Sequence, residues 1–110
     1  MDTNQSLPAT LENVRSIDRT VFDIGRKHSL RAMEVYLLTA LNNTDGHMTT
    51  ADMARSISAS TSQAKQVALR LQERGLVLRV SPRFGLTRIT SDGEALIAVI
   101  ETEIKNALAS

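Results

Sequence analysis

The feature that most constrains the fold is a change of hydrophobic period after the middle of the chain. Up to residue 74 the apolar residues recur every three or four positions, as on one face of a helix. Beyond Gly75 they alternate over residues 76–80 and 86–90, which predicts two short strands. The residues between these strands include Pro82 and Gly85, both typical of a hairpin turn. A mainly α chain with one small β-hairpin is therefore expected.

Two short helices with capping signals precede the predicted hairpin. Thr49, followed three residues later by Asp52, indicates a helix that ends near residue 58. Ser60, followed by Gln63, indicates a second helix over residues 60–74, which Gly75 ends. Two short capped helices joined by a tight turn and followed by a hairpin form a helix-turn-helix with a wing.

Three further helices are predicted outside this unit. The first covers residues 7–27, with Pro8 in its first turn. The second covers residues 30–41, with Ser29 as its N-cap, and the last begins at Thr90 or Ser91. The predicted order is α-α-α-α-β-β-α, and the 110 residues are expected to form a single winged helix-turn-helix domain over residues 1–110.

Composition excludes several classes of protein and site. The chain has no cysteine, so it has neither disulfides nor a thiolate zinc site. The only histidines, His28 and His47, have no carboxylate at metal-ligand spacing, and no Gly-rich phosphate loop or nucleophile triad is present. No metal, no cofactor and no enzymatic activity are therefore expected.

The location of the protein is also predicted from its composition. Residues 1–6 are polar and lack the basic start and apolar stretch of a signal peptide. No apolar run approaches the ~20 residues of a membrane span. A cytoplasmic protein without a membrane partner is expected.

Charge is distributed unevenly along the chain, although the formal net charge is only +1. Residues 49–90 carry seven Lys and Arg against Asp52 and Glu73, whereas residues 1–24 and 91–110 are net acidic. A basic centre between acidic ends favours a polyanion as partner. The chain has only three aromatic residues, so base-stacking platforms for RNA or single strands are not expected. Double-stranded DNA is the partner that these features favour.

Residues that could contact DNA are polar or basic and cluster in the helix-turn-helix and the wing. The second helix of such a motif enters the major groove, where Gln, Lys, Ser and Thr can read base edges. Arg83 lies in the turn, and Arg79 and Arg88 are expected to share a solvent face of the hairpin. The predicted DNA-binding residues are Thr49, Thr50, Ser60, Thr61, Ser62, Gln63, Lys65, Gln66, Arg70, Arg79, Arg83 and Arg88.

Four short motifs within residues 30–96 belong together. They are Leu30-x-x-x-Glu34-x-x-Leu37-Leu38-x-x-Leu41, Met48-Thr49-x-x-Asp52-Met53-Ala54-x-x-Ile57, Ser60-x-Ser62-x-Ala64-x-x-Val67-x-x-Leu71-x-x-x-Gly75-Leu76-Val77 and Ile89-Thr90-x-x-Gly93. In these motifs the chain resembles the winged helix-turn-helix transcription regulators of the multiple antibiotic resistance regulator (MarR) family. The resemblance implies a prokaryotic transcription regulator, with a recognition helix at about residues 60–74 and a wing at residues 76–90. The wing loop of this chain lacks the Asp/Arg-rich stretch that is usual in the family, so the wing function that the resemblance implies rests on Arg83. One helix follows the wing in place of the family's usual final pair, so no residues are assigned to a small-molecule effector.

The resemblance also implies a homodimer on a pseudo-palindromic operator, and the outer helices independently favour one. Apolar stripes on residues 7–27 and 91–109 lie outside the DNA-binding motif and need a partner surface. A polar residue at Val21 or Ile100 is therefore expected to dissociate the dimer. The predicted dimerisation residues are Leu7, Leu11, Val14, Ile17, Val21, Ile24, Ile97, Ile100 and Ile104.

Two other functions fit the same fold. Small winged helices also serve as DNA-binding adaptors in plasmid partition or replication and as phage regulators. A third class binds only protein, and it has no need to concentrate seven basic residues on the motif.

Overall fold

The computed structural model describes residues 3–81 and 85–109, with side chains described from residue 13 onward. It confirms the mainly helical winged helix-turn-helix arrangement, and adds one short strand to it. The elements are α1 (Thr3–Lys27), α2 (Ala32–Asn43), β1 (His47–Met48), α3 (Thr50–Ser56), α4 (Thr61–Glu73), β2 (Val77–Ser81), β3 (Leu86–Ile89) and α5 (Ser91–Ala109).

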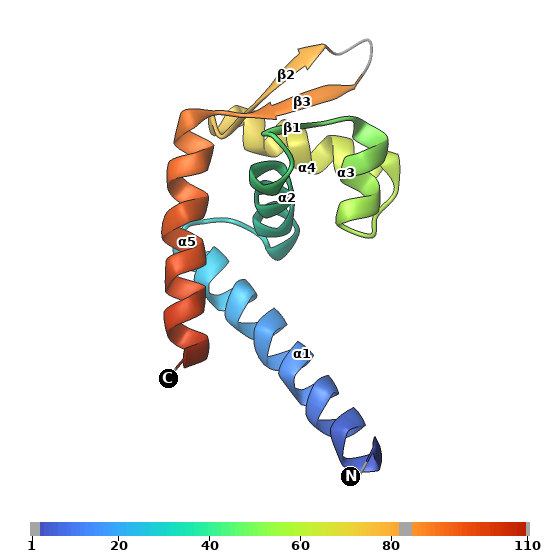
Figure 1. Ribbon diagram of the computed structural model, residues 1–110. Helices are drawn as coiled ribbons and strands as arrows, with labels where there is room; N and C mark the ends of the chain where they lie inside the picture. The colour runs from blue at the N-terminus through green and yellow to red at the C-terminus, as the bar shows by residue number, and fades with distance from the viewer. Residues whose placement is uncertain (1–2, 82–84, 110) are drawn as a thin grey trace.

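The molecule has a helical body with a small sheet at one end (Figure 1). Helices α2, α3 and α4 lie beneath the sheet, while α5 runs away from it along the side of the body. Helix α1 projects from the body, so that the N-terminus lies far from the sheet. The helix-turn-helix with its wing and the outer end of α1 are thus at opposite ends of an elongated chain, 52 Å in its longest extent.

The sheet is antiparallel, with the strand order β1-β3-β2. Strand β1 was not predicted, because its two residues become a strand only by pairing with Thr87 and Arg88 of β3. Leu78 lies opposite Arg88, and Arg79 lies opposite Thr87. Since side chains alternate between the two faces of a strand, this register decides which residues share a face.

The predicted helix boundaries hold where a local cap sets them. Thr49 accepts a hydrogen bond from the Asp52 N–H at 3.2 Å, and Gly75 follows α4 with a φ of +73°. At the start of α5 the cap is Thr90, whose Oγ1 accepts from the Gly93 N–H at 3.1 Å and donates to the Gly75 carbonyl at 2.7 Å. This hydroxyl connects the end of α4 to the start of α5.

Two predicted boundaries were wrong, and a third was met to within two residues. Helix α1 begins at Thr3, so Pro8 lies inside it rather than in its first turn. Ser29 has a φ of +60°, so the N-cap of α2 falls to Arg31, whose extended backbone donates its N–H to Glu34 Oε1 at 2.7 Å. Helix α3 ends at Ser56, before the left-handed Ser58 (φ +53°).

An aliphatic core joins the body helices, and it includes part of the predicted dimerisation stripes. Leu37, Leu38 and Leu41 of α2 are fully buried at its centre. Val21 and Ile24 of α1 and Ile97 and Ile100 of α5 are also buried, because α1, α2 and α5 pack on one another. The chain therefore covers these four residues itself.

The burial of these four residues bears on how the predicted dimerisation residues could be tested. Replacing Val21 or Ile100 by a polar residue would disrupt the core of the protomer, not merely an interface. Val14 and Ile17 of α1 remain 50% and 42% exposed, and Ile104 of α5 is half-buried. Leu7 and Leu11 lie outside the described side chains.

Candidate nucleic-acid interface

Helix α4 is held at its N-terminus by a reciprocal cap. The Gln63 N–H donates to Ser60 Oγ at 3.1 Å, and the Ser60 N–H donates to Gln63 Oε1 at 3.0 Å. Both side chains were predicted DNA contacts, and the structure places both in the capping box. Their oxygens therefore fix the start of α4, the end that would enter a groove.

Four other predicted contacts share the outer face of α4. Ala64, Val67 and Leu71 face the core, which turns the intervening polar residues to solvent. The exposed residues are Thr61, Ser62, Lys65 and Gln66. They offer hydroxyl, ammonium and carboxamide groups, which are the side-chain groups that read base edges and phosphates.

The two predicted threonines before and at the start of α3 have partners within the chain. Thr49 caps α3, while Thr50 Oγ1 donates to the carbonyl of Gly85 at 3.0 Å, at the turn end of β3. Asp52 pairs with Arg55, and hydrogen bonds from Arg55 and Thr49 hold the pKa of Asp52 below its usual value. The first turn of α3 is thereby joined to the wing.

Arg70 lies beside a buried carboxylate that sequence reasoning missed. Its Nε lies 3.4 Å from Glu34 Oε2, and Glu34 is only 4% exposed. Because a buried carboxylate needs a cationic or hydrogen-bonding partner, Arg70 serves the packing of α4 on α2. The signal was Glu34 itself, a charged residue among the apolar residues of a predicted core helix.

The two strand arginines do not share a face, and that prediction was wrong. Arg88 lies opposite Leu78 and is exposed, whereas Arg79 lies opposite the fully buried Thr87 and is half-buried. The backbone N–H of Arg79 also donates a hydrogen bond to Gln72 Oε1 of α4 at 2.8 Å, a contact that the sequence did not indicate. Arg83 lies outside the described residues.

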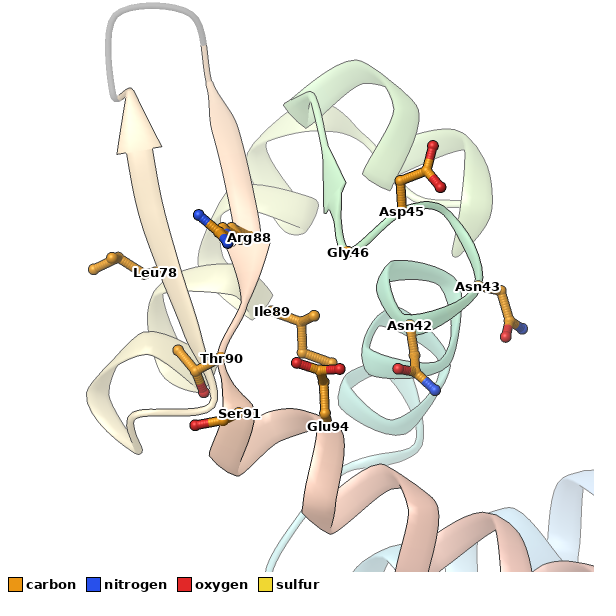
Figure 2. Close-up of a pocket in the computed structure, with 10 residues that line it drawn as sticks. All are labelled: Asn42, Asn43, Asp45, Gly46, Leu78, Arg88, Ile89, Thr90, Ser91 and Glu94. Atoms are coloured by element: carbon orange, nitrogen blue, oxygen red, sulfur yellow. The ribbon is translucent and has the colours of Figure 1, made fainter.

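Arg88 borders a hollow of about 630 Å³ between the outer face of the sheet, the end of α2 and the start of α5 (Figure 2). Asp45 and Glu94 line the same hollow, so its wall carries charges of both signs. Leu78 and Val80, on the outer face of β2, are 55% and 50% exposed. Arg88 thus belongs to the outer sheet face, together with exposed apolar groups.

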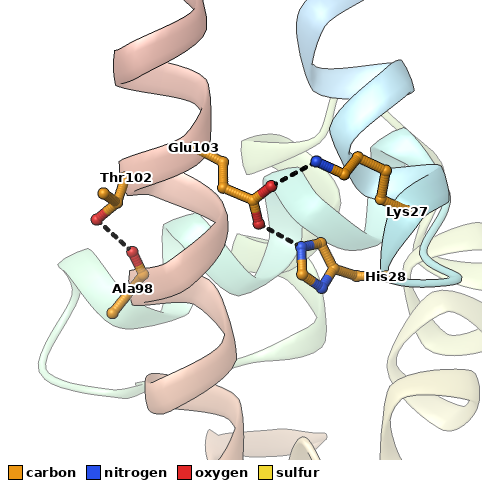
Figure 3. Close-up of polar contacts among 5 residues, drawn as sticks. All are labelled: Lys27, His28, Ala98, Thr102 and Glu103. Carbon is orange, nitrogen blue, oxygen red and sulfur yellow. Dashed lines mark hydrogen bonds and ion pairs between the residues drawn. The ribbon is translucent and has the colours of Figure 1, made fainter.

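Polar contacts join the outer helices α1 and α5 to each other and join α1 to α2 of the body. Glu103 of α5 accepts from Lys27 Nζ at 2.9 Å and lies 2.6 Å from His28 Nε2 (Figure 3). The hydrogen bond from Lys27, followed by that of His28, holds the pKa of Glu103 below its usual value. On α2, burial and a hydrogen bond to Asp18 of α1 raise the pKa of Tyr36 to about 12.

A second hollow, of about 480 Å³, lies between α1, α2 and α5. Val21, Val35 and Ile104 give it apolar walls, and Tyr36, Glu101 and Lys105 add polar groups, of which the last two carry opposite charges. Within the part of the chain that the structure describes, no cluster of His, Asp and Glu could hold a metal ion. No helix in the same part is both long and apolar enough to cross a membrane.

The comparisons with known proteins find a shared fold and no close relative. No protein-family model and no curated protein matches the sequence. Many solved structures do match, and several are described as MarR-family regulators. The similarity confirms the predicted resemblance at the level of the fold.

Three of these structures illustrate the match. The oxidized form of MarR from E. coli has a TM-score of 0.77 at 16% identity, covering 99% of this chain and 79% of that one. A MarR family protein from Bacillus stearothermophilus has a TM-score of 0.78 at 19% identity, covering 98% and 81%. NadR in complex with 4-hydroxyphenylacetate has a TM-score of 0.74 at 21% identity, covering 96% and 76%.

Proposed function

We propose that this chain is a transcription regulator that binds double-stranded DNA in a sequence-specific manner as a homodimer. The observation that carries the proposal is the outer face of α4, where Thr61, Ser62, Lys65 and Gln66 are exposed on a helix with a fixed start. Such a helix fits the major groove, where each base pair presents its own pattern of donors and acceptors. The net positive charge of residues 49–90 supplies attraction to phosphates.

In this proposal the domain divides its work between two regions. Residues 49–90 contact DNA, with α4 in the major groove and the wing on the backbone or in the minor groove. The helices over residues 7–27 and 91–109 pair with a second copy. Exposed Val14 and Ile17 on α1 support this pairing, because they extend the apolar stripe beyond the part that the chain buries itself.

A selection experiment tests the proposal directly. The purified full chain is mixed with fragments of genomic duplex DNA at several salt concentrations, and the retained sites are sequenced, located in the genome and footprinted. We expect a pseudo-palindrome with half-sites separated by about 10 bp, or one helical turn. Retention of unrelated sequences at equal affinity, or a single asymmetric half-site for each protomer, would contradict it.

The same experiment separates the other functions of this fold. A partition or replication adaptor would also select a DNA site, but we expect its sites to be clustered near a replication origin or partition locus. A protein-binding winged helix would retain no DNA at any salt concentration. The basic charge of residues 49–90 favours the DNA-binding classes.

An effector would have one natural place to bind. NadR was solved with 4-hydroxyphenylacetate, and in this chain the hollow between α1, α2 and α5 combines apolar walls with Lys105. We propose small aromatic carboxylates as the first compounds to test. Thermal stabilisation of the wild-type chain, absent in Lys105→Ala, would support binding in this hollow, and equal stabilisation of both would contradict it.

A further inference from the structure

We propose that Thr50 and Gln72 are positioning residues: they set the orientation of the wing, residues 77–89, relative to α4. The inference rests on the proposed DNA-binding function, since orientation matters most when helix and wing bind one duplex. The part of the inference that concerns the free protein, namely that these two residues hold the wing in place, can be tested without DNA.

Thr50 attaches the wing near its turn. Backbone pairing between β1 and β3 reaches Thr87 and goes no further toward the turn. Thr50 Oγ1 then donates to the carbonyl of Gly85 at 3.0 Å, two residues beyond that pairing. The start of α3 is thus bound to the part of the wing that the pairing with β1 leaves without support.

Gly85 is shaped for this contact. Its φ is +65°, in the left-handed region that favours glycine. A Cβ at this position would collide with Thr50 Oγ1 and lie 3.2 Å from Thr50 Cβ. The hydroxyl therefore reaches the carbonyl only because residue 85 has no side chain.

Gln72 attaches the wing to the recognition helix itself. Strand β2 is the edge of the sheet, and an edge strand presents backbone groups that lack a partner strand. The Arg79 N–H of this edge donates to Gln72 Oε1 at 2.8 Å. The Gln72 side chain thereby gives one backbone N–H of the edge strand a hydrogen-bond partner, and it connects this strand to the helix that would lie in the groove.

These two bonds carry much of the polar side-chain contact between the wing and the helices. The buried Arg79 Nε and Thr87 Oγ1, which belong to opposed residues in the sheet, have no hydrogen-bond partner among the described residues. Removal of the Thr50 or Gln72 bond would leave the wing attached through backbone pairing and apolar packing. A wing that samples more orientations would touch fewer phosphates at one time.

The test uses Thr50→Val and Gln72→Met, which remove the hydrogen bond with little change of shape. Thr50→Ser and Gln72→Glu keep an oxygen at the same place and serve as rescue variants. Thr102→Val is a matched control, because it removes a 2.9 Å hydroxyl–carbonyl bond to Ala98 on α5 (Figure 3). Each full-length variant is measured for thermal stability, amide hydrogen exchange of the wing and the salt dependence of binding to random duplex DNA.

We expect wing amides to exchange about five- to tenfold faster in Thr50→Val and Gln72→Met, with a melting temperature close to that of Thr102→Val. The slope of log affinity against log salt should fall by about 0.9 for each phosphate that the variant no longer neutralises, and the rescue variants should match the wild type. Unchanged exchange would overturn the proposal. Lower thermal stability with an unchanged salt slope would assign the two residues a structural role only. If the wild type binds no DNA, the proposed function fails, while hydrogen exchange still decides the positioning.

Discussion

Helix α4 and helix α1 both have an apolar stripe, but the chain buries the whole stripe of α4 and only part of the stripe of α1. In α4 every residue of the stripe is buried by the same chain, and the polar face is left to solvent. In α1 the chain buries Val21 and Ile24 yet leaves Val14 and Ile17 exposed on a helix that projects from the body (Figure 1). An apolar stripe thus predicts that a surface will be buried. Whether the same chain or a second chain covers it depends on which helices of the same chain lie close enough to pack on it.

The largest test of this contrast compares two positions on α1. Val21→Asp places a charge in the core and should lower the free energy of unfolding by at least about 3 kcal/mol. Ile17→Asp should change the unfolding of the protomer by about 0.5 kcal/mol and instead weaken association. Denaturant titration and analytical ultracentrifugation measure the two effects separately. An Ile17→Asp protein that remains dimeric would place the dimer interface elsewhere.

The exposed face of α4 can be tested by base substitution in the selected site. Lys65→Ala or Gln66→Ala should each reduce discrimination at one base position by about 1–3 kcal/mol and keep the preference elsewhere. Competition binding with operators that differ at single positions measures this. Asn42→Ala, at the exposed end of α2 and outside both proposed interfaces, is the control and should change nothing. A uniform reduction across all positions would mean that Lys65 and Gln66 contact only the backbone.

Arg83 of the wing loop should behave in the opposite way. Arg83→Ala is predicted to weaken binding to every sequence alike and to lower the salt slope by about one if the wild-type side chain neutralises one phosphate. Binding measured between low and moderate salt on specific and random duplexes provides the comparison. An intact salt slope would exclude Arg83 from the residues that bind phosphate.

The smallest predicted effect concerns Glu103, which joins α5 to the end of α1. Its pKa is lowered by the hydrogen bonds from Lys27 and His28, so its contribution to stability is complete above the ordinary pKa of a glutamate. The contribution disappears as the pH falls through the lower pKa of the folded state. Glu103→Gln should therefore melt slightly below the wild type at neutral pH, and the difference should vanish in acid, once the pH is below the lowered pKa of Glu103 in the folded state. The same difference at both pH values would contradict a role of the charge, and Glu94→Gln is the exposed control.

The sequence predicted those parts of the fold that depend on local chemistry. Thr49, Ser60 and Gly75 act on backbone groups within a few residues, so their spacing was enough to locate α3 and α4. Ser29 was misassigned because a serine has the same composition signal whether its φ is extended or, as here, +60°. Local signals thus identify a cap only where the backbone conformation agrees.

Other features depend on contacts between residues that are distant in the sequence, and no local sequence pattern predicted these contacts. The faces of Arg79 and Arg88 follow from the register of β2 on β3, which a shift of one residue would reverse. Strand β1 exists because His47 and Met48 meet Thr87 and Arg88 of β3, far along the chain. The hydrogen bonds of Thr50 and Gln72 to the wing likewise join different elements of the fold, and no short motif predicts that these elements lie close together.

Different residues of α4 position the helix and form its exposed face, and this difference has an evolutionary consequence. The residues that fix this helix are Ser60, Gln63 and Gln72, while Lys65 and Gln66 make no hydrogen bond or ion pair within the described part of the chain. Mutations at Lys65 and Gln66 would therefore leave folding nearly unchanged and, in the proposed function, would alter the DNA sequence that is bound. Duplicated copies of such a gene could acquire new operators in single steps, without compensating changes elsewhere in the protein.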